Sequence, residues 1–452
     1  MSFIHKQLFF LGRQKKGVTS VNVISIGLLG LGTVGSGVVK IIENHQDKLM
    51  HQIGCPVKVK KILVKDMNKE RDVQVNPGLL TVNPEEILED SEIDVVIEVM
   101  GGIEETKDYL LRALRNKKNV VTANKDLMAL HSNELLAEAT KNKCDLFYEA
   151  SVAGGIPILR SLVEGLASDR ITKMMGIVNG TTNFILTKMN NHGAPYEEVL
   201  KEAQELGFAE ANPAADVDGL DAARKMAILS TLGFSMPIDL SDVKVEGITG
   251  ITEEDISYSK KLGYTMKLIG LASRSGEKVE VSVQPALLQD SHPLASVNDE
   301  YNAVYVYGEA VGETMFYGPG AGSLPTATAV VSDVVEVMKN MRLGVTGNSA
   351  ISPQFKKALK EPGEITAKYF VRLHVKDEVG VFASITSIFS EHGVSFEKIL
   401  QMPIKEKDLA EIVVITHQAT LQGFEQILQK LQDYDMVRSV KSTYRVEGDK
   451  II

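Results

Sequence analysis

The stretch Val21-Asn-Val-Ile-Ser-Ile26, followed by Gly30-Leu-Gly32-Thr-Val-Gly35, decides how the N-terminal part of this chain folds. A short apolar run favours a buried strand, and glycines in the spacing G-x-G-x-x-G favour a tight turn into a helix, here at residues 37–43. Glycine permits the turn, lets the backbone approach a pyrophosphate and lets the helix pack closely on the strand. Strand, glycine loop and helix in this order are typical of a dinucleotide-binding fold.

Alternating strands and helices continue this pattern. We expect strands at residues 57–64, 94–100, 119–122 and 145–149, and helices at 105–115 and 132–141. Short links between such elements predict a doubly wound, Rossmann-like parallel sheet over residues 21–150. The strand at 119–122 ends at Lys125, on the carboxyl edge where such sheets bind ligands. Lys125 is therefore a candidate site residue, with a simple loop cap as the alternative.

The second strand ends at Lys65-Asp66, where the ribose of a dinucleotide is read. A cation at Lys65 can pair with a 2′-phosphate, which favours NADP. Asp66 can accept a hydrogen bond from an unphosphorylated ribose, which favours NAD. We predict NADP over NAD, and a solvated strand end is the alternative.

Composition excludes several classes of protein. The chain has 452 residues, 44% hydrophobic and 24% charged, as expected for a soluble protein of two or three domains. A formal net charge of -10 argues against a general nucleic-acid or anionic-membrane binder. Cys55 and Cys144 have neither disulfide nor metal-site spacing, which suits a reducing cytoplasm.

The uncharged run from Gly17 to Val39 superficially resembles a secretion signal or a membrane span. Glycines and small polar residues interrupt it, and cleavage there would remove the first strand of the fold. We expect residues 1–20 to form a poorly ordered extension without a targeting role.

The second cluster of polar residues lies at Glu210-Ala-Asn-Pro-Ala-Ala-Asp216-Val-Asp-Gly-Leu-Asp221-Ala-Ala-Arg-Lys225. A turn rich in Pro and Asp leads into a helix at 220–232, on which Asp221 and Lys225 share a face. Several carboxylates near one ammonium can orient a polar substrate and tune a lysine for proton transfer. The alternative is a solvated helix start with an ordinary ion pair.

Residues 151–322 are expected to form an α+β domain with a mixed sheet. Strand-like segments occur at 279–283, 303–307 and 314–317, and helices at about 183–189 and 196–206. A helix at about 323–340 is predicted to return to the nucleotide domain. After a linker at 341–366, residues 367–448 read as β-α-β-β-α-β, a ferredoxin-like order.

From Val21 to about Asn340 the chain resembles homoserine dehydrogenase. The resemblance rests on Gly30-Leu-Gly-Thr-Val-Gly35, Glu98-Val-Met-Gly-Gly102, Thr122-Ala-Asn-Lys125, Glu149-Ala-Ser-Val-Ala-Gly-Gly-Ile-Pro157, Asn179-Gly-Thr-Thr-Asn-Phe-Ile-Leu186, Gly207-Phe-Ala-Glu210 and Asp216-Val-Asp-Gly-Leu-Asp-Ala-Ala-Arg-Lys225. Enzymes of this family reduce L-aspartate 4-semialdehyde to L-homoserine with NAD(P)H, on the route to threonine, isoleucine and methionine.

The resemblance implies that residues 151–322 serve substrate binding, catalysis and dimerisation, and it implies roles for individual residues. Lys225 is the proton donor, Lys125 is a second lysine of the site, and Asp221 and Glu210 hold the amino and hydroxyl groups of the substrate, with Asp216 steadying the group. The positions expected to line the cofactor are Gly30, Leu31, Gly32, Thr33, Val34, Gly35, Lys65, Lys125, Gly207 and Gly322. Positions at which the family holds a monovalent cation, such as sodium, are Glu149, Val152, Gly154 and Ile156.

Residues 367–448 resemble an ACT domain, a module that pairs with copies of itself and binds amino acids. We expect a homodimer or homotetramer regulated by an amino acid, with L-threonine the leading effector at residues 377–383. The alternative is a purely structural dimerisation lobe.

Two other functions are weighed against this one. A catalytically weak amino-acid sensor would not need Lys125, Asp221 and Lys225. A phosphorylating semialdehyde dehydrogenase needs a thiolate nucleophile, and neither cysteine lies in a glycine-rich catalytic turn.

Overall fold

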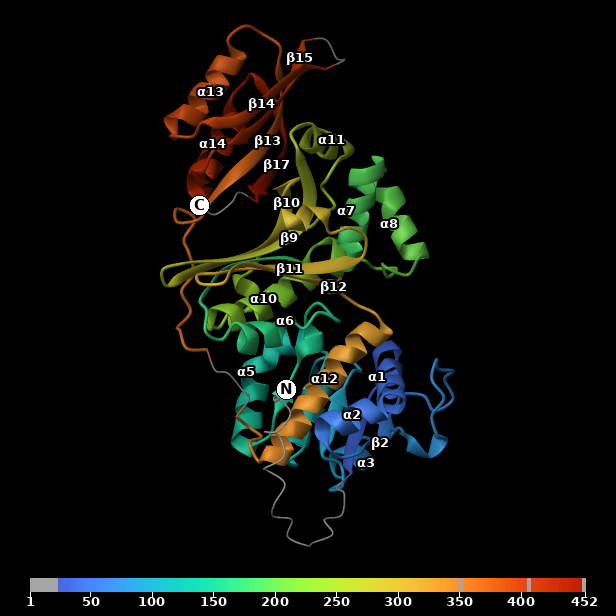
Figure 1. Ribbon diagram of the computed structural model, residues 1–452. Coiled ribbons are helices and arrows are strands. Elements are labelled where there is room, and N and C mark those ends of the chain that lie inside the picture. The colour runs from blue at the N-terminus through green and yellow to red at the C-terminus, as the bar shows by residue number, and fades with distance from the viewer. Residues whose placement is uncertain (1–22, 349–352, 405–407, 449–452) are drawn as a thin grey trace, which may run out of the picture.

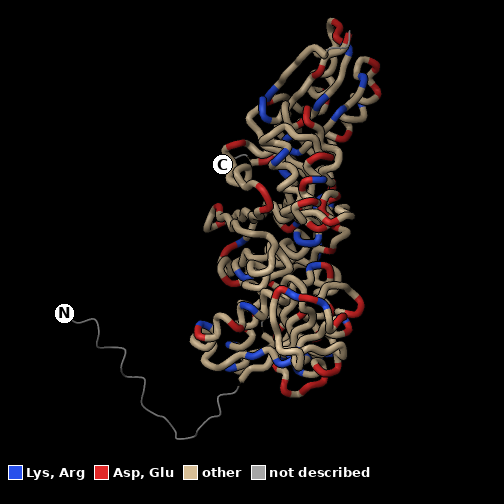
Figure 2. The backbone as a smooth tube through the Cα atoms, turned by 90° about the vertical axis from the view of Figure 1, so that its right-hand side faces the viewer, with Lys and Arg blue, Asp and Glu red and all other residues tan. Residues whose placement is uncertain are grey.

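Three parts are stacked along the long axis of the molecule (Figure 1). The computed structural model describes residues 23–348, 353–404 and 408–448. The extension expected at 1–20 lies outside these residues, as does part of the linker expected at 341–366. Figure 2 shows acidic and basic residues interspersed along the whole elongated body.

The first part is a six-stranded parallel sheet in the order β3-β2-β1-β4-β5-β6. Its strands are β1 (Ile24–Leu29), β2 (Val57–Leu63), β3 (Leu80–Thr81), β4 (Val95–Glu98), β5 (Asn119–Thr122) and β6 (Leu146–Phe147). Strands β1 and β4 are buried along their whole length, as expected where helices cover both faces. This strand order is that of a doubly wound dinucleotide fold, and the prediction is confirmed.

Helices cover this sheet: α1 (Thr33–Asn44), α2 (Gln46–Ile53), α3 (Glu85–Leu88), α4 (Glu104–Arg115) and α5 (Lys125–Asn142). They are joined by α12 (Ser323–Leu343), which returns from the far side of the chain and packs against α1 (Figure 1). A side chain at Gly37 would come within 2.5 Å of the Ser323 carbonyl, so this close packing requires glycine.

Several expected elements have different bounds in this part, among them the helix expected at 37–43, which begins at Thr33, and the strand expected at 94–100, which is Val95–Glu98. The helix expected at 132–141 begins earlier, at Lys125, because the Asn124 side chain accepts a hydrogen bond from the Leu127 backbone N–H at 3.0 Å and caps it. The strand expected at 145–149 is only Leu146–Phe147, because Glu149 already belongs to a 3₁₀ turn, η2 (Glu149–Ser151).

The second sheet has eleven strands in the order β12-β11-β7-β9-β10-β17-β13-β15-β14 with β16 and β8 attached. The half of this sheet that precedes the C-terminal module contains β7 (Ile171–Ile177), β8 (Lys244–Val245), β9 (Tyr264–Ser275), β10 (Lys278–Gln289), β11 (Tyr301–Gly308) and β12 (Gly312–Pro319). Its helices are α6 (Ile158–Arg160), α7 (Gly180–His192), α8 (Tyr196–Glu205), α9 (Ala214–Val217), α10 (Leu220–Phe234) and α11 (Glu253–Lys261). Helix α10 packs on β7, β9 and β10.

The sequence pattern does not identify β7 and β9, because Met, Lys and Gly within them are not typical of strands. Strand β10 is also longer than the expected 279–283, continuing through Pro285, which lies opposite Leu268 of β9. Strand β7 pairs with β9 and β11, which are distant from it in the chain, whereas β9 and β10 form one long antiparallel hairpin.

The C-terminal module follows the expected order β-α-β-β-α-β. It consists of β13 (Thr366–Lys376), α13 (Val381–Glu391), β14 (Phe396–Pro403), β15 (Leu409–Thr416), β16 (Ala419–Thr420), α14 (Leu421–Asp433) and β17 (Val437–Glu447). The module is not a separate lobe attached by the linker alone, because β17 pairs with β10 in parallel over residues 445–447. One continuous sheet therefore joins the module to the domain that carries α10.

Buried charges reinforce this junction. The Glu447 carboxylate accepts hydrogen bonds from Lys173 Nζ of β7 and from Arg445 Nε, both at 2.6 Å. Burial opposes ionisation, but Arg445 and Lys173 outweigh it and hold the pKa of Glu447 at about 2. Because this pKa lies below the unfolded value of about 4.3, ionised Glu447 stabilises the fold above that pH.

Replacing Glu447 with Gln tests this ionic junction. Removing this carboxylate takes away the ion-pair partner of Lys173 and leaves Arg445 with Glu280 alone, so we expect the free energy of unfolding at pH 7 to fall by roughly 3–5 kcal/mol. The wild type should lose this advantage as the pH falls from about 4.3 toward 2. Thermal unfolding across that range, with exposed Glu425→Gln as control, measures the effect. Equal losses in both variants at pH 7 would contradict it.

Candidate active site

The Asp221 carboxylate, in the first turn of α10, is the centre of the candidate site. It is only 6% exposed, and it lies between two ammonium groups. Its Oδ2 lies 2.7 Å from Lys225 Nζ, and its Oδ1 lies 3.1 Å from Lys125 Nζ. The predicted pair on one helix face is therefore formed, and Lys125 joins it from the nucleotide domain.

Two further contacts fix Lys225 and Asp221. Lys225 Nζ donates to the Val178 carbonyl at 2.6 Å. The Asn179 amide donates to Asp221 Oδ2 at 2.9 Å and to Asp216 Oδ1 at 2.7 Å. Asn179 thus brings Asp216 into the group, and it is a site residue that spacing alone does not assign. Its signal was the Asn179-Gly180 turn before α7, whose N-cap it forms.

The pKa values of the two carboxyl groups, Asp221 and Asp216, are shifted in opposite directions. Burial disfavours the charged form of Asp221, but Lys225 and Lys125 outweigh burial and lower its pKa well below the usual range. Burial dominates at Asp216 and raises its pKa, although Asn179 donates to it. For Lys125, burial lowers the pKa, and Asp221 more than reverses this, so the net shift is upward. The group therefore holds an ionised Asp221 and a charged Lys125.

Paired contacts between α5 and α10 join the nucleotide domain to the catalytic helix. Lys125 and Asp126 open α5, and they pair with Asp221 and Arg224 of α10 respectively. The second pair, Arg224 Nε to Asp126 Oδ1, spans 2.9 Å. Both ion pairs cross the domain boundary, so the site depends on the relative position of the two domains.

Glu98, at the end of β4, shapes the loop beside this group. It is fully buried, and its Oε1 accepts hydrogen bonds from the backbone N–H of Met100 at 2.8 Å and of Gly101 at 3.0 Å. Its Oε2 accepts the Thr122 hydroxyl at 2.5 Å. Burial raises the pKa of Glu98. In the sequence, the sign of this positioning role is a Glu at the end of a strand that is expected to be buried.

Two neighbouring cavities run along the carboxyl edge of the parallel sheet. The first, of about 460 Å³, is lined by Gly30, Leu31, Gly32, Leu63, Val64, Lys65, Asp66, Lys69, Arg71, Val82, Val99, Met100, Glu105 and Tyr109. The second, of about 300 Å³, is lined by Val34, Glu98, Val99, Met100, Gly101, Ala123, Asn124, Lys125 and Asp126. Because they share Val99 and Met100, a dinucleotide can extend from Lys65 to Lys125.

Three other positions predicted to line the cofactor are Gly35, Gly322 and Gly207. Gly35 must be glycine, because a side chain there would meet the Gly30 carbonyl at 2.2 Å. Gly322, with φ of 124°, is the N-cap of α12, and the next residue, Ser323, donates to the Thr33 carbonyl at 2.7 Å. Gly207 lies in an exposed turn after α8 and lines neither cavity.

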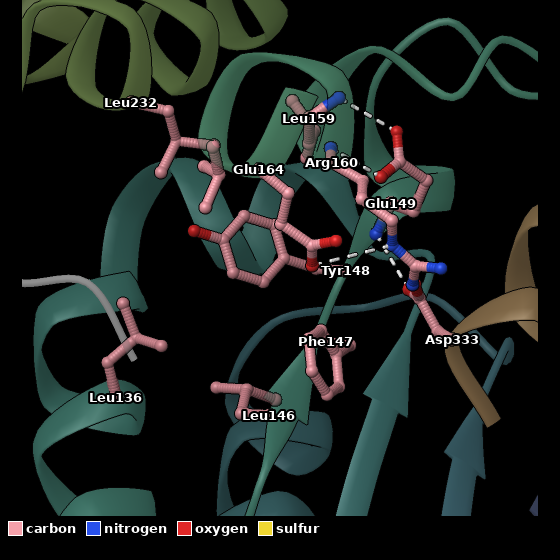
Figure 3. A pocket seen from close by; sticks show the side chains of 11 residues that line it. Leu136, Leu146, Phe147, Tyr148, Glu149, Leu159, Arg160, Glu164, Leu232 and Asp333 are labelled. Carbon is pink, nitrogen blue, oxygen red and sulfur yellow. Dashed lines mark hydrogen bonds and ion pairs between the residues drawn. The ribbon is translucent and has the colours of Figure 1, made fainter. Parts of the chain in front are cut away.

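The crossover after β6 contains the four predicted cation positions. Figure 3 shows the Glu149 carboxylate directed at the backbone N–H groups of Leu159 and Arg160, both 2.8 Å away. Asp333 of α12 accepts from the Glu149 backbone N–H at 2.9 Å and from Arg160 Nη2 at 2.7 Å. Glu149 thus uses its side chain to hold the crossover, and only its main chain is available to a cation.

The loop also bends sharply at Ala153 and Gly154, with φ of 53° and 46°. A side chain at Gly154 would meet the Gly320 carbonyl at 2.4 Å, so two main-chain loops approach each other closely there. Val152 and Ile156 are buried beside this bend. Within the described part of the chain, no group of three or more His, Cys, Asp or Glu side chains is arranged to hold a metal.

One predicted substrate residue is not brought into the group. Glu210 is exposed, and among the described residues its carboxylate forms no ion pair with Lys125 or Lys225. Its backbone carbonyl accepts a hydrogen bond from Gln204 at 3.2 Å.

None of the helices described is long and apolar enough to cross a membrane.

Comparison with known families agrees with this geometry. The models for homoserine dehydrogenase, for the NAD-binding domain of homoserine dehydrogenase and for the ACT domain match residues 157–335, 30–149 and 369–435. The homoserine dehydrogenase of Bacillus subtilis is 69% identical, covering 95% of this chain and 99% of that protein. The chain belongs to the homoserine dehydrogenase family.

Solved structures extend this family relation to the fold. A homoserine dehydrogenase from Thiobacillus denitrificans superposes with a TM-score of 0.89 at 37% identity, over 94% of this chain and 98% of that one. A hyperthermophilic archaeal homoserine dehydrogenase in complex with NADPH superposes with a TM-score of 0.59 at 27% identity, over 70% of this chain and 97% of that one. The predicted homoserine dehydrogenase family and ACT domain are confirmed.

Replacing Lys225 with Ala tests the candidate active site. If Lys225 is the proton donor, we expect turnover in the homoserine dehydrogenase reaction to fall by roughly 10²–10⁴-fold, while the dinucleotide still binds. Steady-state rates and NADPH fluorescence titration measure the two effects. Lys188→Ala, in α7 and paired with Glu202, is the control. Near-normal turnover of Lys225→Ala would contradict the assignment.

Proposed function

We propose that this protein catalyses the reversible NAD(P)H-dependent reduction of L-aspartate 4-semialdehyde to L-homoserine. The observation that carries the proposal is the buried Asp221–Lys225 pair, joined by the half-exposed Lys125, beside the cavities of the nucleotide domain. The product feeds the synthesis of threonine, methionine and isoleucine. A catalytically weak sensor is not favoured, because such a group is costly to bury without a function.

The chemistry follows from what an aldehyde reduction requires. The nicotinamide, when bound, supplies the hydride. The aldehyde oxygen becomes an alkoxide, and it needs a proton and a nearby positive charge. Lys225 has three N–H donors, and among the described residues two are directed at Asp221 and the Val178 carbonyl. The third can donate to the substrate oxygen and then transfer its proton, after which solvent reprotonates the amine.

Substrate orientation is assigned to the carboxylates around this lysine. Ionised Asp221 aligns both ammonium groups, and Asp216, held by Asn179, faces the same group. We assign the substrate's amino group to these two carboxylates. Glu210 can share this role only if the exposed turn around residues 207–213 moves toward the substrate.

We further propose NADP(H) as the preferred cofactor. Lys65, Lys69 and Arg71 line one cavity and place three positive charges at the end of β2, which suits a 2′-phosphate. Asp66 lines the same cavity, but its carboxylate accepts a hydrogen bond from the Asn68 backbone N–H at 2.8 Å. The archaeal homoserine dehydrogenase bound to NADPH supports this choice. Lys69 and Arg71 are additional candidates beyond the predicted Lys65.

A monovalent cation, for example sodium, fits the crossover loop through carbonyl oxygens, which hard cations prefer. The donors would be main-chain oxygens of Glu149, Val152, Gly154 and Ile156, since the Glu149 carboxylate is already hydrogen-bonded. Such an ion would brace the crossover between the two domains.

Regulation is assigned to the ACT module. An amino-acid effector, with L-threonine as the leading candidate, would bias the catalytic domain through the continuous sheet formed by β10 and β17. Coupling between distant sites of this kind is typically about 1–3 kcal/mol. Self-association into a homodimer or homotetramer, in the cytoplasm, completes the proposal.

Cofactor choice is tested by Lys65→Ala. Loss of one charged contact to a 2′-phosphate should lower kcat/KM for NADPH about 10- to 100-fold, with little change for NADH. Steady-state kinetics with both cofactors measure the ratio. Lys58→Ala, exposed on the same strand, is the matched control. An unchanged NADPH-to-NADH ratio means that Lys65 does not read the phosphate.

Regulation is tested with L-threonine. The full-length enzyme should lose activity as L-threonine is added, and a chain ending at Gly344 should not respond. We also expect the shortened chain to melt at a lower temperature, because the edge of β10 loses β17. If the full-length enzyme ignores every aspartate-family amino acid in rate measurements and calorimetry, the module is structural.

A further inference from the structure

Glu98 is the last residue of β4, beside the point where the order of the parallel strands reverses between β1 and β4. It lies between Leu29 of β1 and Thr122 of β5, at the carboxyl edge of the sheet. Ligands of doubly wound sheets bind in the crevice at this edge. Glu98 also lines the cavity of about 300 Å³ that contains Lys125, so its carboxylate belongs to the wall of a ligand site.

The reactive end of a dinucleotide fits the cavity that Glu98 lines. The neighbouring cavity contains Gly30 and Gly32 of the glycine loop, and Lys65 at the end of β2. The diphosphate and the adenosine therefore fill that first cavity. The nicotinamide end lies in the second cavity, beside Lys125 and close to the group around Asp221.

The hydrogen bonds of Glu98 are those of an ionised carboxylate. Its Oε1 accepts from the backbone N–H groups of Met100 and Gly101. Thr122 Oγ1 accepts from the Asn124 backbone N–H at 3.0 Å, and it donates its single hydrogen to Glu98 Oε2 at 2.5 Å. Every one of these partners is a donor, as the ionised form requires.

Among the described residues, no positive charge compensates this buried anion. Glu98 is fully buried, and burial raises its pKa, opposed only by hydrogen bonds from neutral groups. Two other charged residues line the same cavity, and both are already paired. Lys125 contacts Asp221, and Asp126 contacts Arg224. An unpaired buried charge is costly, and a neutral Gln at position 98 could hold the same loop without that cost, so the charge itself calls for an explanation.

The oxidised cofactor brings the missing positive charge. When a hydride, with its two electrons, passes from the dihydronicotinamide to the aldehyde carbon, the C=O π bond opens and Lys225 protonates the oxygen. The nicotinamide ring is left as a cation. A fixed carboxylate close to the ring therefore interacts differently with the reduced and the oxidised cofactor, and protein charges near a cofactor ring tune its chemistry in this way.

We propose that Glu98 is the counter-charge of the nicotinamide ring. Its carboxylate favours the oxidised over the reduced cofactor in the cavity, and it stabilises the positive charge that develops on the ring as the hydride leaves. Glu98 acts through its field across the cavity wall, in addition to holding the loop at Met100 and Gly101. The inference rests on the NAD(P)H-dependent reduction proposed above.

Paired binding measurements on the full-length enzyme test the proposal. Calorimetry gives the Kd of NADP⁺, and fluorescence titration gives that of NADPH, for the wild type and for Glu98→Gln. The Gln amide keeps an acceptor for Met100 and Gly101, and its NH₂ group can donate to Thr122. We expect the ratio of the Kd of NADP⁺ to that of NADPH to rise at least about 10-fold, because only the oxidised ring carries a charge. Binding of 2′-phospho-ADP-ribose, which lacks the nicotinamide, should not change.

Further variants separate the charge of Glu98 from its structural role. Thr122→Val removes one hydrogen bond of Glu98 and leaves its charge, and Glu105→Gln removes a carboxylate from the first cavity. Both should keep the wild-type ratio. Glu98→Ala, in which water can bond to the released N–H groups, removes the charge by a second route and should raise the ratio as Glu98→Gln does.

An unchanged ratio in the charge-removing variants would overturn the proposal. Equal weakening of NADP⁺, NADPH and 2′-phospho-ADP-ribose, or an equal shift of the ratio in Thr122→Val, would overturn it too and make Glu98 a structural residue alone. Each of these results leaves the proposed reduction intact. If the wild type binds neither NADP⁺ nor NADPH, the proposed cofactor fails, and the role of Glu98 fails with it.

Discussion

One buried carboxylate, Asp221, holds the catalytic arrangement together. Two ammonium groups, from Lys225 on the same helix and from Lys125 on the nucleotide domain, approach it within 3.1 Å. An ionised carboxylate that is almost excluded from water must be paired with positive charge. Loss of either lysine would leave the buried charge of Asp221 less compensated and would destabilise the fold. The candidate active site is therefore also a contact between domains, and the position of the nucleotide cavities relative to Lys225, the proposed proton donor, depends on it.

The second sheet gives this contact a rigid base. Helix α10 packs on β7, β9 and β10, and β10 continues into the ACT module through β17. A sheet shared in this way connects the ACT module directly to a strand on which α10 packs. Buried ion pairs of Glu447 with Lys173 and Arg445 hold the junction, so the junction is specific in register.

The sequence predicted the nucleotide domain well because its signals are local. The glycine loop at 30–35, the apolar parallel strands and the spacing of Asp221 and Lys225 all fall within a few residues. It could not place β7, whose partners β9 and β11 are distant in the chain, or β9, which pairs with β7 as well as with its hairpin neighbour β10, or the join between β10 and β17. Asn179 and Glu98 were quoted only as parts of motifs, because their hydrogen bonds reach distant residues such as Asp221 and Thr122. Glu210 lies near Asp221 in sequence, but in the structure it is exposed.

The measurement that tests the central claim most directly is the turnover of Asp221→Asn, compared with exposed Asp218→Asn. Asparagine keeps the shape but removes the charge that aligns both lysines. The account predicts that kcat for aspartate semialdehyde reduction falls by roughly 10²-fold or more, while the Kd for NADPH, from fluorescence titration, changes little. Wild-type kcat in Asp221→Asn would contradict the claim that this carboxylate organises the site.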